Sequence, residues 1–265
     1  MTLSVYVSGI GMLGPGFENW PDAIEILTGR KRYANAPTLL PIPAMLPSAE
    51  RRRTGRVVKL ALAVALEATE NAGADPRQLA SVFSSSGADG HICHEICQAL
   101  ASPAREVSPT RFSNSVHNAA AGYWSIATGS MSESNVVCAF DASFCAGLLE
   151  AMTQTHVEQR DILLVAYDTE YPPPLHAKRP IPDGFGIAMV LTPAATINSL
   201  ARLQFELTSA AFETLAEPAL EALRASIPAA RALPMMRLLA ARQTGNVVVE
   251  YLGGTNAAIQ VEACG

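Results

Sequence analysis

The residues best suited to chemistry lie near the middle of the chain, where an apolar run meets a run of small residues. Residues 136–140 are typical of a buried strand and residues 142–151 of a helix, with Asp141 between them. A strand that leads directly into a helix turns sharply and exposes one side chain above the helix N-terminus. Free N–H groups and the helix dipole stabilise negative charge there, which suits a nucleophile. We call residues 138–145 the elbow.

Three side chains of the elbow are candidate nucleophiles. Asp141 is a weak one, because its acyl product would be a mixed anhydride that water hydrolyses readily. Cys145 would lie in the first helical turn, where the helix end can activate a thiol, although a small buried hydrophobe is the commoner role. Ser143 would need a base, and His117 and His156 are the only histidines near it in sequence.

A second cluster has residue types that bind metals, namely His91, Cys93, His94 and Cys97. On a helix Cys93 and Cys97 would share a face. Zinc sites usually draw ligands from more than one element, and no second Cys/His pair follows elsewhere. We therefore expect a helix here, with no metal and no other cofactor.

Composition narrows the possible partners and compartment. The chain has 265 residues, 49% of them apolar, so it can bury a large core as one domain or two fused halves. Its net charge of −5, with no basic run beyond residues 51–53, argues against nucleic acid. No apolar run reaches the ~18 residues of a membrane span. The N-terminus lacks a signal-peptide pattern, and the five cysteines read as reduced thiols, so we expect a cytoplasmic protein.

Hydrophobic patterns predict an alternation of strands and helices, which is typical of the α/β class. Glycines follow the first strand, where they would allow a tight turn and close backbone approach, but their spacing does not fit a dinucleotide loop. The predicted strands are residues 3–7, 80–84, 136–140, 161–166, 186–191, 203–207, 246–251 and 257–262. The predicted helices are residues 20–29, 57–72, 142–151, 218–227 and 232–242, with one more after a turn within residues 108–129.

The order and spacing of several motifs resemble a β-ketoacyl synthase of the thiolase fold. They are the opening strand and glycines of residues 5–12, the helix of residues 52–73, the Asn118–Gly129 pattern, the Asp183-Gly184-Phe185-Gly186 turn, and the loop Leu252, Gly253, Gly254, Thr255 and Asn256. The resemblance implies a thiolase-like layered α/β/α architecture. It also implies a complete N-terminal half, residues 1–192, and a strongly reduced C-terminal half, residues 193–265, in one compact unit.

The chain departs from that family at its catalytic positions. An ungapped count from Ala121-Gly122 places the family's nucleophilic cysteine at Asp141, and gaps of two or four place it at Ser143 or Cys145. The family's two catalytic histidines are also missing, because no histidine lies in residues 193–245. We therefore expect no catalytic residue in this chain. We predict that Asp141 caps the following helix, stabilising it by about 0.3–1 kcal/mol, and that it blocks acylation.

Within the family, the chain resembles chain-length factors, especially the shortened subunits of aryl-polyene and pigment polyketide systems. The resemblance implies a heterodimer with a catalytic ketosynthase subunit, contact with acyl carrier protein through that complex, and a role in polyketide or fatty-acid-like chain elongation. It also implies a tunnel wall at the subunit interface, formed by Phe112, Ser115, Val116, His117, Asn118 and Trp124. The alternatives are an acyltransferase or hydrolase that uses Cys145 or Ser143, and a scaffold protein with no tunnel role.

Overall fold

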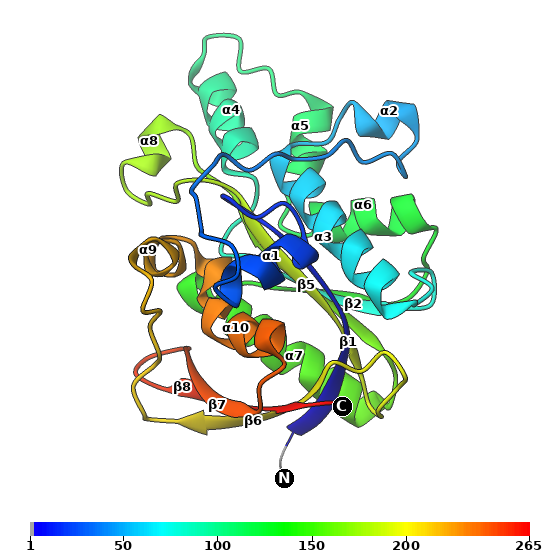
Figure 1. Ribbon diagram of the computed structural model, residues 1–265. Helices are drawn as coiled ribbons and strands as arrows, with labels where there is room; N and C mark the ends of the chain where they lie inside the picture. Colours follow the sequence, from blue (N-terminus) through cyan, green and yellow to red (C-terminus); the bar gives the residue numbers. More distant parts are fainter. Residues whose placement is uncertain (1–2) are drawn as a thin grey trace.

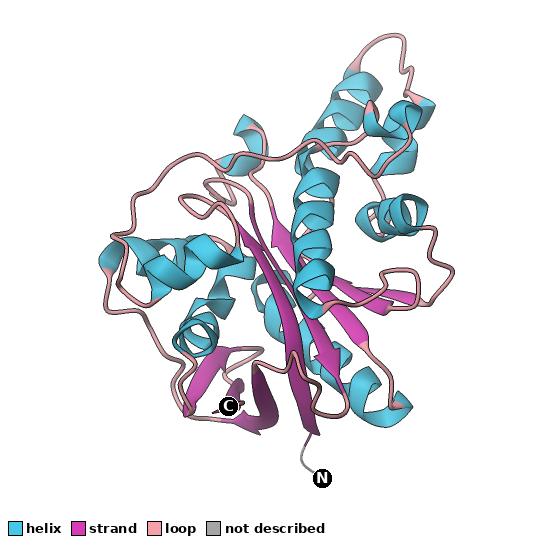
Figure 2. Cartoon of the chain, turned by 45° about the vertical axis from the view of Figure 1, so that its right-hand side comes forward, coloured by secondary structure: helices cyan, strands magenta, loops and turns pink. Residues whose placement is uncertain are grey.

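A single mixed sheet runs through the molecule, with helices on both faces (Figures 1 and 2). The computed structural model describes residues 3–265, and within them the sheet has eight strands in the order β3-β2-β4-β5-β1-β6-β8-β7. The strands are β1 (Leu3–Leu13), β2 (Ala80–Ser84), β3 (Ser134–Val137), β4 (Ile162–Asp168), β5 (Phe185–Thr192), β6 (Ala201–Thr208), β7 (Gly245–Glu250) and β8 (Asn256–Ala263). This layering confirms the predicted thiolase-like α/β/α architecture.

The predicted helices are all present with small changes at their ends, except that α7 continues to residue 158, beyond the predicted end at residue 151. The α-helices are α1 (Trp20–Leu27), α2 (Ser48–Arg51), α3 (Arg56–Ala72), α4 (Gly90–Ala101), α5 (Pro109–Asn114), α6 (Ala119–Thr128), α7 (Ser143–Glu158), α8 (Pro173–His176), α9 (Pro218–Ser226) and α10 (Leu233–Ala241). Two short 3₁₀ helices are η1 (Phe140–Ala142) and η2 (Pro228–Ala232). The short helices α5 and α8 lie in segments where the sequence predicted a turn and a loop.

Strand direction divides the sheet into two regions. β2 pairs in parallel with β3 and with β4, whereas β4, β5, β1, β6, β8 and β7 are joined by antiparallel pairs. Parallel strands need a covering crossover, and every residue of β2 and β4 is buried, whereas the edge strand β3 is partly exposed. The elbow follows β3, so it lies at the carboxyl end of the parallel region.

Alternate side chains of β4 belong to two separate cores, one on each face of the sheet. Leu163 and Val165 pack with α3 and α6, while Ile162 and Leu164 pack with α7, α1 and α10. All seven residues of β4 are buried. A strand that is covered on both faces has a continuous run of apolar residues instead of alternating apolar and polar residues. That continuous run is why β4 could be predicted from the sequence.

The first strand is longer than the sequence predicted, because its glycines are part of it. The strand extends through Leu13, so Gly9 and Gly11 form no tight turn. A Cβ at Gly9 would lie 2.3 Å from the carbonyl oxygen of Ala68, and one at Gly11 2.1 Å from that of Val64. The expected close backbone approach is therefore confirmed, and it lets α3 pack directly on β1.

The segment after β5 extends the same sheet. β6 pairs with β1, and β8 and β7 follow outward from it. Helix α10 and η2 cover this extension on the face that also carries α1 and α7 (Figure 1). Residues from the end of the chain are thereby placed beside the elbow.

Candidate functional site at the elbow

The elbow is not the direct strand-to-helix turn that the sequence predicted. β3 ends at Val137 instead of residue 140, and η1 intervenes before α7 begins at Ser143. Phe140 has a φ of 52°, in the left-handed region that an L-residue rarely adopts. The Ser143 hydroxyl stabilises this turn, because it accepts from the Ala139 amide at 3.0 Å and donates to the Phe140 carbonyl at 2.7 Å.

Helix α7 packs closely against β2 just after the elbow. A Cβ at Gly147 would lie 2.5 Å from the Cβ of Ser84, so only glycine fits there. The Ser84 hydroxyl donates to the Ser143 carbonyl at 2.5 Å. The start of α7 is thus held in place by its neighbouring strand.

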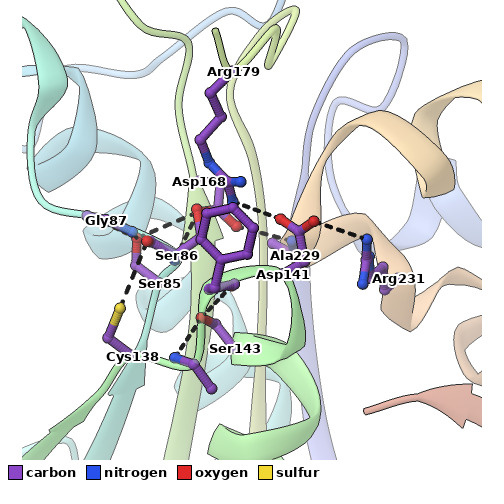
Figure 3. Close-up of polar contacts among 12 residues, drawn as sticks. Ser85, Ser86, Gly87, Cys138, Asp141, Ser143, Asp168, Arg179, Ala229 and Arg231 are labelled. Carbon is purple, nitrogen blue, oxygen red and sulfur yellow. Dashed lines mark hydrogen bonds and ion pairs between the residues drawn. The ribbon is translucent and has the colours of Figure 1, made fainter. Parts of the chain in front are cut away.

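Asp141 bridges two arginines and caps no helix. Its two carboxylate oxygens accept hydrogen bonds from Arg179 at 2.6 Å and from Arg231 at 3.2 Å (Figure 3). The side chain makes no hydrogen bond to the N-terminus of α7, so the prediction of a helix cap is wrong. The reason is electrostatic: a charged guanidinium is a stronger partner for a carboxylate than a neutral amide.

Both arginines have further contacts that fix their positions. The Arg179 guanidinium lies 3.9 Å from the ring centroid of Phe140, a cation–π contact. Arg231 also pairs with Glu250 of β7 at 3.0 Å. Asp141 therefore connects the elbow to the segment after α8, to η2 and, through Arg231, to the end of β7.

A buried carboxylate lies beneath this ion-pair network. Asp168 at the end of β4 is 3% exposed and accepts from the amide of Ser86 at 2.8 Å and from that of Ala229 at 2.9 Å. Burial raises the pKa of Asp168 to about 6, while these hydrogen bonds and nearby Arg179 act to lower it. Asp168 joins the turn after β2 to η2, so it positions both beside the elbow (Figure 3).

The two other candidate nucleophiles lack the surroundings that would activate them. Ser143 is 1% exposed, and its hydroxyl bonds the backbone atoms described above rather than a base. Cys145 is 1% exposed, and burial raises the pKa of its thiol to about 12. A thiol that stays protonated at neutral pH is a poor nucleophile, since the thiolate is the reactive form.

The residues predicted to line a tunnel divide into a surface group and one core residue. Phe112 on α5 is 65% exposed and Val116 48% exposed, and Asn118 is also exposed. Ser115 is half-buried. Trp124 is only 1% exposed and packs with α3, so the expectation that it meets a partner is wrong. Its large ring faces inward because α6 has to cover the sheet.

His117 lies between these two groups. It is half-buried, and burial lowers the pKa of its ring while the nearby backbone of Ser85 acts to raise it. Its Nε2 has no hydrogen-bond partner within residues 3–265. In the described part of the chain, the Ser143 hydroxyl makes its hydrogen bonds with Ala139 and Phe140 and not with His117.

The glycine-rich loop is the turn between β7 and β8. Gly253 and Gly254 have φ values of 58° and 82°, and Leu252 is 48% exposed. The Thr255 amide donates to the Leu252 carbonyl at 2.9 Å, and the Asn256 side chain bonds Tyr251 and Ala210. The loop is linked to the elbow through Glu250, the last residue of β7, which pairs with Arg231.

Sequence reasoning missed Arg179, Arg231 and Asp168. Asp168 carried a usable signal, because it is a carboxylate that ends an entirely apolar strand. The two arginines carried none, since they lie 38 and 90 residues from Asp141, Arg179 in the loop after α8 and Arg231 in η2.

The structure also places the residues that could bind a metal and gives the lengths of the helices. Within the part of the chain that it describes, no three His, Cys, Asp or Glu residues gather as a metal ion would require. The cluster of residues 91–97 lies on α4 as expected, and His91 is 3.9 Å from Glu170. None of the helices in residues 3–265 has the length and apolarity needed to cross a bilayer.

Comparison with known proteins assigns the family. The model described as "Beta-ketoacyl synthase, N-terminal domain" matches residues 24–249. The chain therefore belongs to the β-ketoacyl synthase N-terminal domain family. Among curated proteins, none matches the sequence significantly.

Solved structures with a similar fold include complexes of ketosynthases. One is a chain of the ketosynthase (ApeO) in complex with its chain length factor (ApeC) from Xenorhabdus doucetiae, with 23% identity, a TM-score of 0.73, and coverage of 97% of this chain and 99% of that chain. The ishigamide ketosynthase/chain length factor matches with 14% identity and a TM-score of 0.74 over 99% of this chain and 100% of that one. AntDE:AntF, a type II polyketide synthase acyl-carrier protein in complex with its ketosynthase, matches with 12% identity and a TM-score of 0.76 over 100% of both chains.

Proposed function

We propose that this chain is a non-catalytic partner subunit of the chain-length-factor type. It pairs with a catalytic β-ketoacyl-carrier-protein synthase in the cytoplasm and shapes the acyl tunnel during polyketide elongation of the aryl-polyene type, or fatty-acid-like elongation. Acyl carrier protein contacts it through that complex. The observation that carries the proposal is Asp141, which occupies the family's nucleophile position and is held by two arginines. A carboxylate neutralised in this way cannot take the place of a thiolate.

The free edge of β3 supports pairing with a second chain. The carbonyl groups of Glu133 and Val137 accept hydrogen bonds from β2. Successive residues of a strand direct their backbone groups to opposite sides, so the N–H of Val136 points away from β2, toward the open edge of the sheet. Within residues 3–265 no backbone group bonds this outer edge. An open strand edge is a ready site for strand addition by a partner.

Exposed apolar side chains lie on the segments that flank this edge. Phe140, directly after β3, is 63% exposed, and Ile126 on α6, which contacts β3, is 50% exposed. Val116 and Phe112, which precede α6, are also exposed. Apolar groups around an unpaired strand would be covered in a complex, and we propose that Phe112, Ser115, Val116, His117 and Asn118 wall the tunnel there.

The opposite edge of the sheet is a natural control. The Val248 carbonyl of β7 accepts from the Glu213 amide at 2.9 Å, so the chain itself partly covers that edge. Because successive residues of β7 direct their backbone groups to opposite sides, the N–H of Asn246 also points away from β8, toward this edge.

The experiment is co-expression with ketosynthases that retain the active cysteine, followed by light scattering and a carrier-protein elongation assay. We expect a 1:1 heterodimer that elongates only when both chains are present. Val136→Pro removes one outward N–H of β3 and should abolish co-purification, whereas Asn246→Pro should leave the heterodimer intact. A lone chain that elongates or hydrolyses acyl-carrier substrate would overturn the proposal.

The proposed role in shaping the tunnel can be tested separately, by measuring the length of the acyl product. Val116→Trp should shorten the main product and Val116→Ala should lengthen it, with the heterodimer unchanged. A scaffold protein would tolerate both substitutions with no change in product.

A further inference from the structure

An open pocket of about 360 Å³ lies directly against the elbow. Lys178, Arg179 and Arg231 line it, and Asp141 is its one acidic lining residue. The pocket is therefore strongly basic in a chain whose net charge is −5. Figure 3 shows both arginines turned toward Asp141 from opposite sides.

The cationic donors of this pocket outnumber their acceptors. Asp141 engages one nitrogen of each arginine, and Glu250 engages a second nitrogen of Arg231. The Nε groups of Arg179 and Arg231 are buried and have no hydrogen-bond partner within residues 3–265. Over the same residues, the side chain of Lys178 makes no hydrogen bond or ion pair, so its three N–H donors are available to a ligand.

The carboxylates behind the pocket do not satisfy these donors. Glu250 contacts Arg231 and, at 3.9 Å, Arg224. Asp168 lowers the positive potential near Arg179, but it is enclosed and bonds Ser86 and Ala229 instead. Both carboxylates offset part of the positive charge of the pocket. Neither of them accepts a hydrogen bond from the Lys178 side chain or from the Nε groups of the two arginines.

We propose that this pocket binds the phosphate group of a small phosphate monoester. The three cations of the pocket come from two separate segments, Lys178 and Arg179 after α8 and Arg231 in η2, and three cationic groups suit an oxyanion with three terminal oxygens better than a carboxylate with two. Pro180, Ala225 and Pro228 form an aliphatic part of the lining, against which the ester group packs. The site depends on no partner subunit, so it goes beyond the pairing with a ketosynthase.

The test is calorimetric titration of the full chain alone, in low-salt buffer, with inorganic phosphate and with n-butyl phosphate. We expect one site per chain, with butyl phosphate binding about fourfold or more tightly, as burial of one or more methylene groups implies. Raising the salt concentration should weaken both, because the attraction is largely electrostatic.

Three variants separate this site from general attraction to a charged surface. Lys178→Gln should raise the dissociation constant about fivefold, and Asp141→Asn should lower it, because one competing negative charge is removed. Lys59→Gln, which removes a lysine from a different pocket against α3, should have no effect. Absence of saturable binding, equal affinity for the two phosphates, or an equal loss in Lys59→Gln would overturn the proposal. Because no ketosynthase is present, such a failure leaves the proposed partner role standing.

Discussion

Asp141 offers the sharpest test of how the elbow is held. Asp141→Ala removes the carboxylate that Arg179 and Arg231 share, and these side chains are only 19% and 12% exposed. Breaking a fully buried pair costs roughly 3–5 kcal/mol because the remaining charge is left uncompensated. Asp141 is 36% exposed, so water replaces part of the lost interaction. We expect the free energy of unfolding to fall by about 1–3 kcal/mol.

Urea unfolding followed by circular dichroism would measure this change, with the slope of the transition checked for equality between variants. In thermal unfolding the midpoint should fall by roughly 2–8 °C. The matched control is Glu25→Ala, which removes the exposed pair with Arg30 and should leave the midpoint unchanged. Added acetate should restore part of the stability of Asp141→Ala, because it can occupy the vacated position between the arginines.

Two results would refute the reasoning about Asp141. If Asp141→Ala were as stable as the wild type, the arginines would not depend on it. If Asp141→Cys became acylated by acyl-carrier substrate without a partner, the chain would contain oxyanion support that we have not identified, and its non-catalytic assignment would fail.

Three further predictions concern the surroundings of the elbow. Because burial raises the pKa of Asp168 from 3.8 to about 6, the folded chain holds a proton between these pH values that the unfolded chain releases. The contribution of Asp168 to stability is therefore present below pH ~4 and is lost, by up to roughly 3 kcal/mol, as the pH rises to about 6. The free energy of unfolding of the wild type minus that of Asp168→Asn, measured at each pH, should fall over this range. Cys145 should resist iodoacetamide at pH 7.5 until the chain unfolds, whereas the exposed Cys138 should react in the native state, as mass spectrometry would show; rapid native labelling of Cys145 would restore it as a nucleophile. Gly147→Ala forces a Cβ against Ser84 and should destabilise the fold by about 1–3 kcal/mol in urea unfolding, and a neutral result would mean that α7 can shift freely.

The sequence predicted the α/β class because its strongest patterns are local. The apolar run at residues 161–166 and the helix at residues 57–72 reappear as β4 and α3 with changes of one or two residues. It was wrong about the extent of β1, since Gly9 and Gly11 are read as turn residues unless the helix that packs on them is known. It was also wrong about Trp124, because a large aromatic can serve equally at an interface or in a core.

By itself, the sequence determined that an ungapped count places Asp141 at the family's nucleophile position and that residues 193–245 contain no histidine, because both depend only on residue type and spacing along the chain. Only the tertiary structure decided what Asp141 does. Its partners, Arg179 in the loop after α8 and Arg231 in η2, lie 38 and 90 residues away, and no local sequence pattern indicates that they meet. The physical reason is that propensity and periodicity act over a few residues, whereas charge pairing and burial depend on distances that exist only after the sheet has brought β3, β4 and η2 together.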